Sequence, residues 1–144
     1  MTRSLIIVGG PTGSGKSALA LDLAAKFSGT VINADAMQVY AGLPILTNSP
    51  GAADEARAPH RLFGILPPSE SCSAGRWQGL AQQACAEAWS GNRIPIVVGG
   101  TGLYLRALTK GLSPIPPVPD QVRETARALL GDIGAPALRP RQSA

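Results

Sequence analysis

The chain contains few of the residues that build metal centres, disulfide frameworks or base-stacking surfaces. Its 144 residues include two cysteines and one histidine, and aromatic residues make up 4%. This content excludes a zinc finger, a cysteine-rich secreted scaffold and a histidine-rich metal centre, and it argues against base-stacking platforms of the RRM or OB type. Cys72 and Cys85 lack CxxC spacing and are expected to be reduced thiols in a cytoplasmic protein.

Long hydrophobic runs are also missing. No stretch approaches the roughly 18 apolar residues of a membrane span, and the apolar run at residues 5–8 is too short for a signal peptide. We therefore expect a cytoplasmic protein without a membrane partner, and we expect it to be a monomer.

The net charge of +4 is small and unevenly distributed. Residues 1–72 carry five basic and five acidic side chains, so the whole excess lies in residues 73–144. On charge alone this favours a solvated basic surface over a nucleic-acid interface. The length suits one domain, and 17 glycines with 13 prolines predict many turns and close backbone approaches.

Apolar periodicity predicts strands that alternate with helices. Continuous apolar runs at 5–8 and 94–98 are typical of strands buried on both faces of a parallel sheet. Strands are expected at residues 5–8, 30–33, 62–66 and 94–98, helices at 16–27, 73–89, 103–108 and 122–130, a loop at 41–59 and a proline-rich break at 114–119. This alternation predicts an α/β fold, a parallel sheet flanked by helices.

Two of the expected strands end in the same way. Residues 8–13 read Val-Gly-Gly-Pro-Thr-Gly, and residues 98–102 read Val-Gly-Gly-Thr-Gly. Both strands should open onto the carboxyl edge of the sheet, where ligands bind in open α/β folds. The repeat therefore favours a site at that edge.

A phosphate-binding loop follows the first expected strand. Residues 10–17 match the P-loop pattern G-x-x-x-x-G-K-[ST] without deviation. The predicted diphosphate or nucleotide contacts are Gly10, Pro11, Thr12, Gly13, Ser14, Gly15, Lys16 and Ser17. Glycines let successive N–H groups surround phosphate oxygens, Lys16 supplies a point charge, and Ser17 offers a hydroxyl to Mg²⁺.

The loop pattern specifies phosphate but not what the phosphate is attached to. Both ATP and a smaller diphosphate are therefore open as ligands. Asp35 follows the second expected strand, and its spacing alone is compatible with a metal-associated group, a general base or a turn residue.

Four segments together resemble one family, the tRNA dimethylallyltransferases. They are residues 10–17, Ile-Asn-Ala-Asp-Ala-Met-Gln-Val-Tyr at 32–40, Ala-Pro-His-Arg-Leu at 58–62, and Ile-Pro-Ile-Val-Val-Gly-Gly-Thr-Gly-Leu-Tyr-Leu at 94–105. Their order and spacing agree with the family as well as their content, and the resemblance extends from residue 4 to about residue 138. A generic nucleotide kinase shares only the first segment.

The resemblance implies a reaction, the transfer of the dimethylallyl group of dimethylallyl diphosphate to the exocyclic amine of the adenosine 3′ of the anticodon. Lys16 and Mg²⁺ would stabilise the leaving diphosphate, and Asp35 would accept the proton of the amine. The family pattern also assigns a catalytic-site position to Thr101. It implies tRNA contacts at Asp35, Ala36, Met37, Gln38, Thr101 and Arg123.

The chain departs from the family pattern in two respects. Ala36 stands where the family usually has serine, which removes one hydroxyl. Family members are also about twice as long and carry a helical insertion that grips the anticodon stem. We therefore expect residues 1–138 to form an incomplete P-loop core, residues 139–144 to be an unstructured tail, and the chain to be a truncated form with impaired activity.

Two other functions compete with this interpretation. A small P-loop kinase would fit the length, but it leaves residues 35–40 and 98–104 unexplained. The second alternative is a non-catalytic phosphate- or RNA-binding remnant.

The remaining residues of note have structural roles in this interpretation. We expect His60 to be structural, Met37 and Tyr40 to pack against other side chains, and Trp77 and Trp89 to lie in the core.

Overall fold

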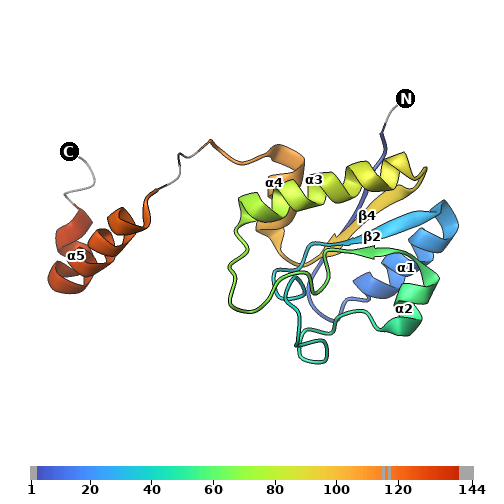
Figure 1. The fold of residues 1–144 in the computed structure, drawn as a ribbon, viewed down its shortest axis with the longest axis horizontal. Coiled ribbons are helices and arrows are strands. Elements are labelled where there is room, and N and C mark those ends of the chain that lie inside the picture. The colour runs from blue at the N-terminus through green and yellow to red at the C-terminus, as the bar shows by residue number, and fades with distance from the viewer. Residues whose placement is uncertain (1–2, 115, 117, 140–144) are drawn as a thin grey trace. The chain divides into compact units, whose positions relative to one another are not determined.

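The computed structural model describes residues 3–114, 116 and 118–139 (Figure 1). In chain order the elements are β1 (Ile6–Gly9), α1 (Lys16–Phe27), β2 (Gly29–Asn33), α2 (Ala52–Arg57), β3 (His60–Arg61), α3 (Ala74–Ser90), β4 (Ile94–Gly99), α4 (Gly102–Lys110) and α5 (Asp120–Leu138). They form two compact units, residues 1–112 and 113–144. No helix in the described ranges is both long and apolar enough to cross a membrane.

The second unit is built on α5. The helix predicted at 122–130 is confirmed and is longer than expected, with a break at Gly134, whose φ is 72°. None of the described α5 residues is buried. Of the predicted tail, Arg139 directly follows α5, whereas residues 140–144 lie outside the described part of the chain. Residues 115 and 117 of the predicted proline-rich break lie outside it too.

The first unit contains a parallel sheet with the strand order β1-β4-β2-β3. The predicted α/β class is confirmed. β4 lies between β1 and β2, so the two strands that end in glycine pairs are neighbours, with Gly9 opposite Gly99. This adjacency brings both loops to one edge of the sheet, as the repeated sequence predicts.

The prediction of a strand at residues 62–66 is wrong. The third strand is β3, which pairs with Val31 and Ile32 of β2, and of the predicted segment only Leu66 makes a bridge, to Tyr40. Leu62 and Gly64 have positive φ values of 65° and 59°, which a strand cannot contain.

Helices cover both faces of the sheet, and each face has its own core (Figure 1). Strand residues alternate between the two cores, so Val31 and Ile96 face α1 while Ile32 and Val97 face α3 and α4. The α3-side core contains Trp77, which is fully buried, and Trp89 packs against it as expected.

Burial of β1 on both faces is not observed. In the described residues β1 pairs only with β4 and forms an edge of the sheet. Ile7 is 39% exposed there, whereas every residue of β2 is buried. A continuous apolar run therefore indicates a parallel strand, but not its place in the sheet.

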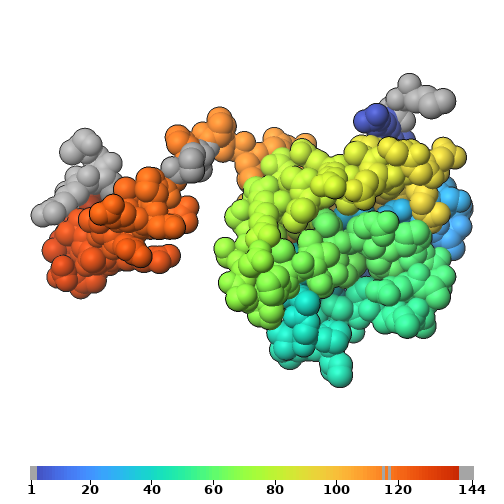
Figure 2. Space-filling view, in the orientation of Figure 1, coloured from blue at the N-terminus to red at the C-terminus, as the bar shows by residue number. Residues whose placement is uncertain are grey.

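The predicted loop at 41–59 contains a short helix, α2, which the composition of the loop did not indicate. Its first turn is supported by Asp54, whose Oδ2 accepts a hydrogen bond of 3.3 Å from the Gly51 amide. The preceding residues, 41–50, protrude at the lower edge of the unit in Figure 2 (cyan to turquoise). Ile45 is 95% exposed in this segment.

Gly99, the last residue of β4, lies against the chain that leaves β2. A Cβ atom at Gly99 would lie 2.2 Å from the carbonyl carbon and oxygen of Ala34, and 2.7 Å from the amide nitrogen of Asp35. Those neighbours are backbone atoms directly after β2, and Ala34 is fully buried, so they have little room to move. The close approach of the two backbones thus requires glycine here.

We predict that Gly99→Ala lowers the free energy of unfolding by about 3 kcal/mol, the upper end of the usual cost of overpacking. Gly79→Ala is the control. It lies inside α3 with no atom near the added methyl, and it should raise stability by about 0.5–1 kcal/mol. Urea unfolding of both variants measures the difference. An unfolding midpoint of Gly99→Ala equal to that of the wild type would contradict the close approach.

Candidate functional site

The P-loop connects the end of β1 to the start of α1. Gly13 and Gly15 have φ values of 77° and 82°, the left-handed conformation that glycine adopts without strain. The Ser14 hydroxyl donates to the Pro11 carbonyl at 2.8 Å, and Lys16 Nζ donates to the same carbonyl. The lysine ammonium is thus held inside the turn of the loop, at the positive end of α1.

The two glycine pairs meet behind this loop. A Cβ atom at Gly100 would lie 3.2 Å from the Gly10 carbonyl oxygen. The turn that follows β4 is therefore in close backbone contact with the P-loop, and it connects the P-loop to the turn that contains Asp35.

Asp35 occupies a tight turn directly after β2. Its Oδ1 accepts hydrogen bonds from the amides of Met37 at 2.8 Å and Gln38 at 3.4 Å. This Asx-turn fixes the side-chain torsion of Asp35. Among the described residues both of these bonds end on one carboxylate oxygen, so Oδ2 is the oxygen available to the pocket that Asp35 lines.

Thr101 holds the next residue of the turn. Its Oγ1 accepts a 2.9 Å hydrogen bond from the Ala36 amide, and its own amide donates to the Ala34 carbonyl at 3.2 Å. Thr101 thereby connects the turn after β2 to the start of α4.

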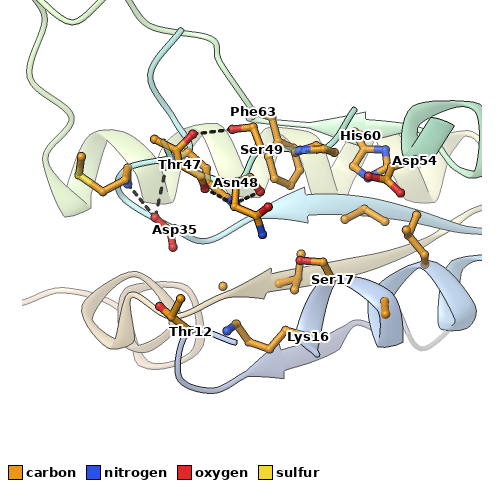
Figure 3. Close-up of a pocket in the computed structure, with 18 of the residues that line it drawn as sticks. Thr12, Lys16, Ser17, Asp35, Thr47, Asn48, Ser49, Asp54, His60 and Phe63 are labelled. Carbon is orange, nitrogen blue, oxygen red and sulfur yellow. Dashed lines mark hydrogen bonds between the residues drawn. The ribbon is translucent and has the colours of Figure 1, made fainter. Parts of the chain in front are cut away.

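A pocket of about 460 Å³ lies between the P-loop and the segment at 46–63 (Figure 3). This volume is within the range of small-molecule sites. Of the predicted site residues it is lined by Thr12, Gly13, Gly15, Lys16, Ser17, Asp35, Met37 and Gln38. The structure thus brings the predicted phosphate-binding and proton-accepting groups together in one cavity.

The other predicted site residues do not line this pocket. Gly10, Pro11 and Ser14 shape the loop beneath it, and Ala36 and Thr101 support the Asp35 turn. Arg123 lies exposed on α5, in the second unit.

The outer wall of the pocket was not predicted. It is formed by His60 of β3, by Phe63, which follows β3, and by six residues of the 41–59 loop: Leu46, Thr47, Asn48, Ser49, Pro50 and Asp54. The Gln38 side chain places part of this wall, because its amide nitrogen donates to the carbonyls of Thr47 and Asn48, each at 2.9 Å. The 41–59 loop carries no periodic apolar pattern, so nothing in the sequence marked these residues.

The structure also decides three of the packing expectations. His60 has the predicted structural contact, from Nδ1 to the Ala58 carbonyl at 2.8 Å, but it lines the pocket as well. Tyr40 packs as predicted, and its hydroxyl accepts from the Cys72 amide at 3.1 Å. The prediction that Met37 packs is wrong, since 57% of this residue is exposed beside the pocket.

The pocket is lined by few charged side chains, and the cation and the carboxylates lie on different walls. Lys16 supplies the cation at the P-loop, and Asp35 and Asp54 supply carboxylates on the other walls.

In the described part of the chain no three His, Cys, Asp or Glu side chains cluster as a metal centre. Oxygen donors that line the pocket include the Thr12 and Ser17 hydroxyls of the loop and the Asp35 carboxylate. Hydroxyl and carboxylate oxygens suit Mg²⁺, which is held by few protein oxygens and completes its shell with phosphate and water.

Comparison with known families gives one clear match. The family model for the IPP transferases matches residues 38–141. The curated relatives include the tRNA dimethylallyltransferase of Rhodospirillum centenum, 59% identical over 99% of this chain, and that of Paramagnetospirillum magneticum, 52% identical over 94%. The chain spans 46% and 43% of these relatives, less than half of their length.

Solved structures give the same result. The tRNA isopentenylpyrophosphate transferase of Bacillus halodurans superposes with a TM-score of 0.76 at 34% identity, over 99% of this chain and 47% of that one. A eukaryotic dimethylallyltransferase acting on tRNA superposes with a TM-score of 0.74 at 35% identity, over 84% of this chain and 31% of that one.

We predict that Lys16→Ala weakens binding of inorganic diphosphate in the presence of Mg²⁺ by about 10- to 150-fold. The loss corresponds to one charge-assisted hydrogen bond, worth about 1.5–3 kcal/mol. Lys26→Ala is the matched control, because Lys26 lies exposed in the last turn of the same helix. Isothermal titration calorimetry measures both, and equal affinity in Lys16→Ala and the wild type would refute the P-loop assignment.

Proposed function

The chain belongs to the IPP transferase family, and on that premise we propose that it carries the reaction pocket of a tRNA dimethylallyltransferase. The observation that carries the proposal is the shared cavity of Lys16, Ser17 and Asp35. A leaving group with negative charge and an amine that loses a proton need these two kinds of side chain within one pocket.

We assign the P-loop to the diphosphate of dimethylallyl diphosphate. An allylic carbon–oxygen bond breaks easily once the charge on the departing oxygen is stabilised. The amides around Gly13 and Gly15, the positive end of α1 and the Lys16 ammonium supply that stabilisation from fixed positions. Mg²⁺ held through the Ser17 hydroxyl would add Lewis-acid stabilisation of the same phosphate oxygens.

We assign Asp35 as the base that accepts the proton from the attacking amine. Oδ1 is engaged by two backbone amides, so the carboxylate is held in one orientation with Oδ2 as its reactive oxygen. A base that is already oriented contributes about 10²- to 10⁴-fold to a proton transfer.

The tRNA contacts proposed for residues 35–38, Thr101 and Arg123 differ in how the structure presents them. Met37 is exposed beside the pocket and is available to a base. The Gln38 amide group is engaged with loop carbonyls, which leaves Oε1 for a partner. Arg123 is exposed on α5 and suits a phosphate.

The comparisons do not favour a small P-loop kinase. The relatives named above are transferases that act on tRNA, and their similarity includes residues 35–40 and 98–104, which a kinase leaves unexplained. ATP as the ligand of the loop has no support from them.

We predict that Asp35→Asn lowers the kcat of prenyl transfer by about 10²- to 10⁴-fold and leaves tRNA affinity nearly unchanged, because an amide cannot accept the proton. The test uses a full-length form, in which this chain is completed with the remaining part of the Rhodospirillum centenum relative. Asp22→Asn is the control, since Asp22 lies exposed on α1 in an ion pair with Arg57. Transfer that survives in Asp35→Asn, with tRNA affinity reduced instead, would make Asp35 a positioning residue.

We predict that the 144-residue chain alone binds diphosphate but transfers no dimethylallyl group to tRNA. A net charge of +4 provides few of the phosphate contacts that give strong RNA affinity, and an amine that is not positioned loses most of its rate advantage. Transfer of radiolabelled allyl group to unmodified tRNA is the assay. Turnover equal to that of the full-length form would show that the rest of the family domain is dispensable.

A further inference from the structure

We infer that Asn33 is a positioning residue for the reaction, which fixes the Asp35 turn and one wall of the pocket through a single buried side chain. The expected effect on kcat rests on the proposed function. The contacts of Asn33 come from the geometry alone and do not depend on that function.

The Asn33 side chain holds Asp35 at both ends of its backbone. Asn33 Oδ1 accepts from the Asp35 amide at 2.8 Å, and Asn33 Nδ2 donates to the Asp35 carbonyl at 3.0 Å. Fixing the peptide groups on both sides of Asp35 fixes the direction of its Cα–Cβ bond. The Asx-turn then fixes the carboxylate on that bond.

The same side chain reaches the opposite segment of the pocket. Asn33 Nδ2 also donates to the Leu62 carbonyl at 3.0 Å, 29 residues further along the chain. Leu62 has a φ of 65°, a conformation that is costly for leucine and needs support from its surroundings. Leu62 lies between His60 and Phe63, which line the pocket. Asn33 therefore sets the position of Asp35 relative to that wall.

The environment of Asn33 allows no substitute partner. Asn33 is 0% exposed, and its three side-chain bonds use both amide hydrogens and the oxygen. Its backbone carbonyl accepts from Trp77 Nε1 at 2.9 Å, and Trp77 is itself fully buried and stacked on Tyr104 at 4.6 Å. Water cannot replace the lost contacts in so closed a site, so their removal must move the turn.

The decisive variant is Asn33→Asp, which keeps the size and the acceptor but removes both donors. In the full-length form we expect kcat for prenyl transfer to fall by about 10²-fold, the usual effect of a displacement of about 1 Å at a reacting group. KM for dimethylallyl diphosphate should stay within about 3-fold, because the P-loop contacts do not involve Asn33.

Thr30→Val is the matched control. Thr30 lies on the same strand, is 4% exposed, and its Oγ1 accepts from Arg93 Nε at 3.1 Å. The variant loses a part-buried hydrogen bond whose two residues do not line the pocket, so it should lower the melting temperature without lowering kcat more than about 2-fold. An unchanged kcat in Asn33→Asp, or equal losses of kcat in both variants, would overturn the inference.

A measurement on the unsubstituted chain separates this inference from the proposed function and needs no variant that must fold. By NMR, the two Nδ2 protons of Asn33 and the amide proton of Asp35 should exchange slowly with solvent, since all three donors have hydrogen-bond partners and the Asn33 side chain is buried. Fast exchange of these protons, beside slow exchange at the Ala34 amide that donates to Val98, would overturn the inference. Absence of transfer by the unsubstituted full-length form would instead refute the proposed function.

Discussion

The site depends on the contact between two backbones at Gly99. Because β4 ends in a residue without a side chain, the chain leaving β2 can lie directly on it, with Ala34 atoms where a Cβ would be. The amide of Ala34 donates to the Val98 carbonyl at 2.7 Å, and its carbonyl accepts from the Thr101 amide at 3.2 Å. Backbone hydrogen bonding between these two segments therefore continues past the end of β2. Asp35, the next residue, is thereby held beside the P-loop.

This contact has a chemical consequence. The carboxyl edge of a parallel sheet collects the ends of several strands, and here it brings the P-loop after β1 into one cavity with the Asp35 turn after β2. The cation and the α1 dipole lie on one side of the cavity and the Asp35 carboxylate lies on another. The proposed reaction uses this separation, because its departing anion and its departing proton would lie at different walls of a single pocket.

Buried polar groups around the end of β2 keep this arrangement rigid. Asn33 and Trp77 are both inaccessible to solvent, and each has its hydrogen-bond partners. Tyr104 stacks on Trp77 and donates its hydroxyl to the Cys72 carbonyl at 3.2 Å, and burial raises its pKa above the usual range, so the phenol stays neutral. Buried networks in which every member is satisfied resist rearrangement, because any movement leaves a polar group without a partner.

The sequence by itself determined the features that depend on neighbouring residues. The P-loop at 10–17, the strands at 30–33 and 94–98 and the repeated glycine pairs are local patterns, and the predicted fold class and the shared sheet edge are confirmed. Only the tertiary structure decided that β1 is an edge strand, that Leu62 turns the chain out of β3, and that residues of the 41–59 loop wall the pocket. It also decided the role of Asn33, whose partner Leu62 is 29 residues away. These features arise from contacts between distant segments, and such contacts leave no periodic pattern along the chain.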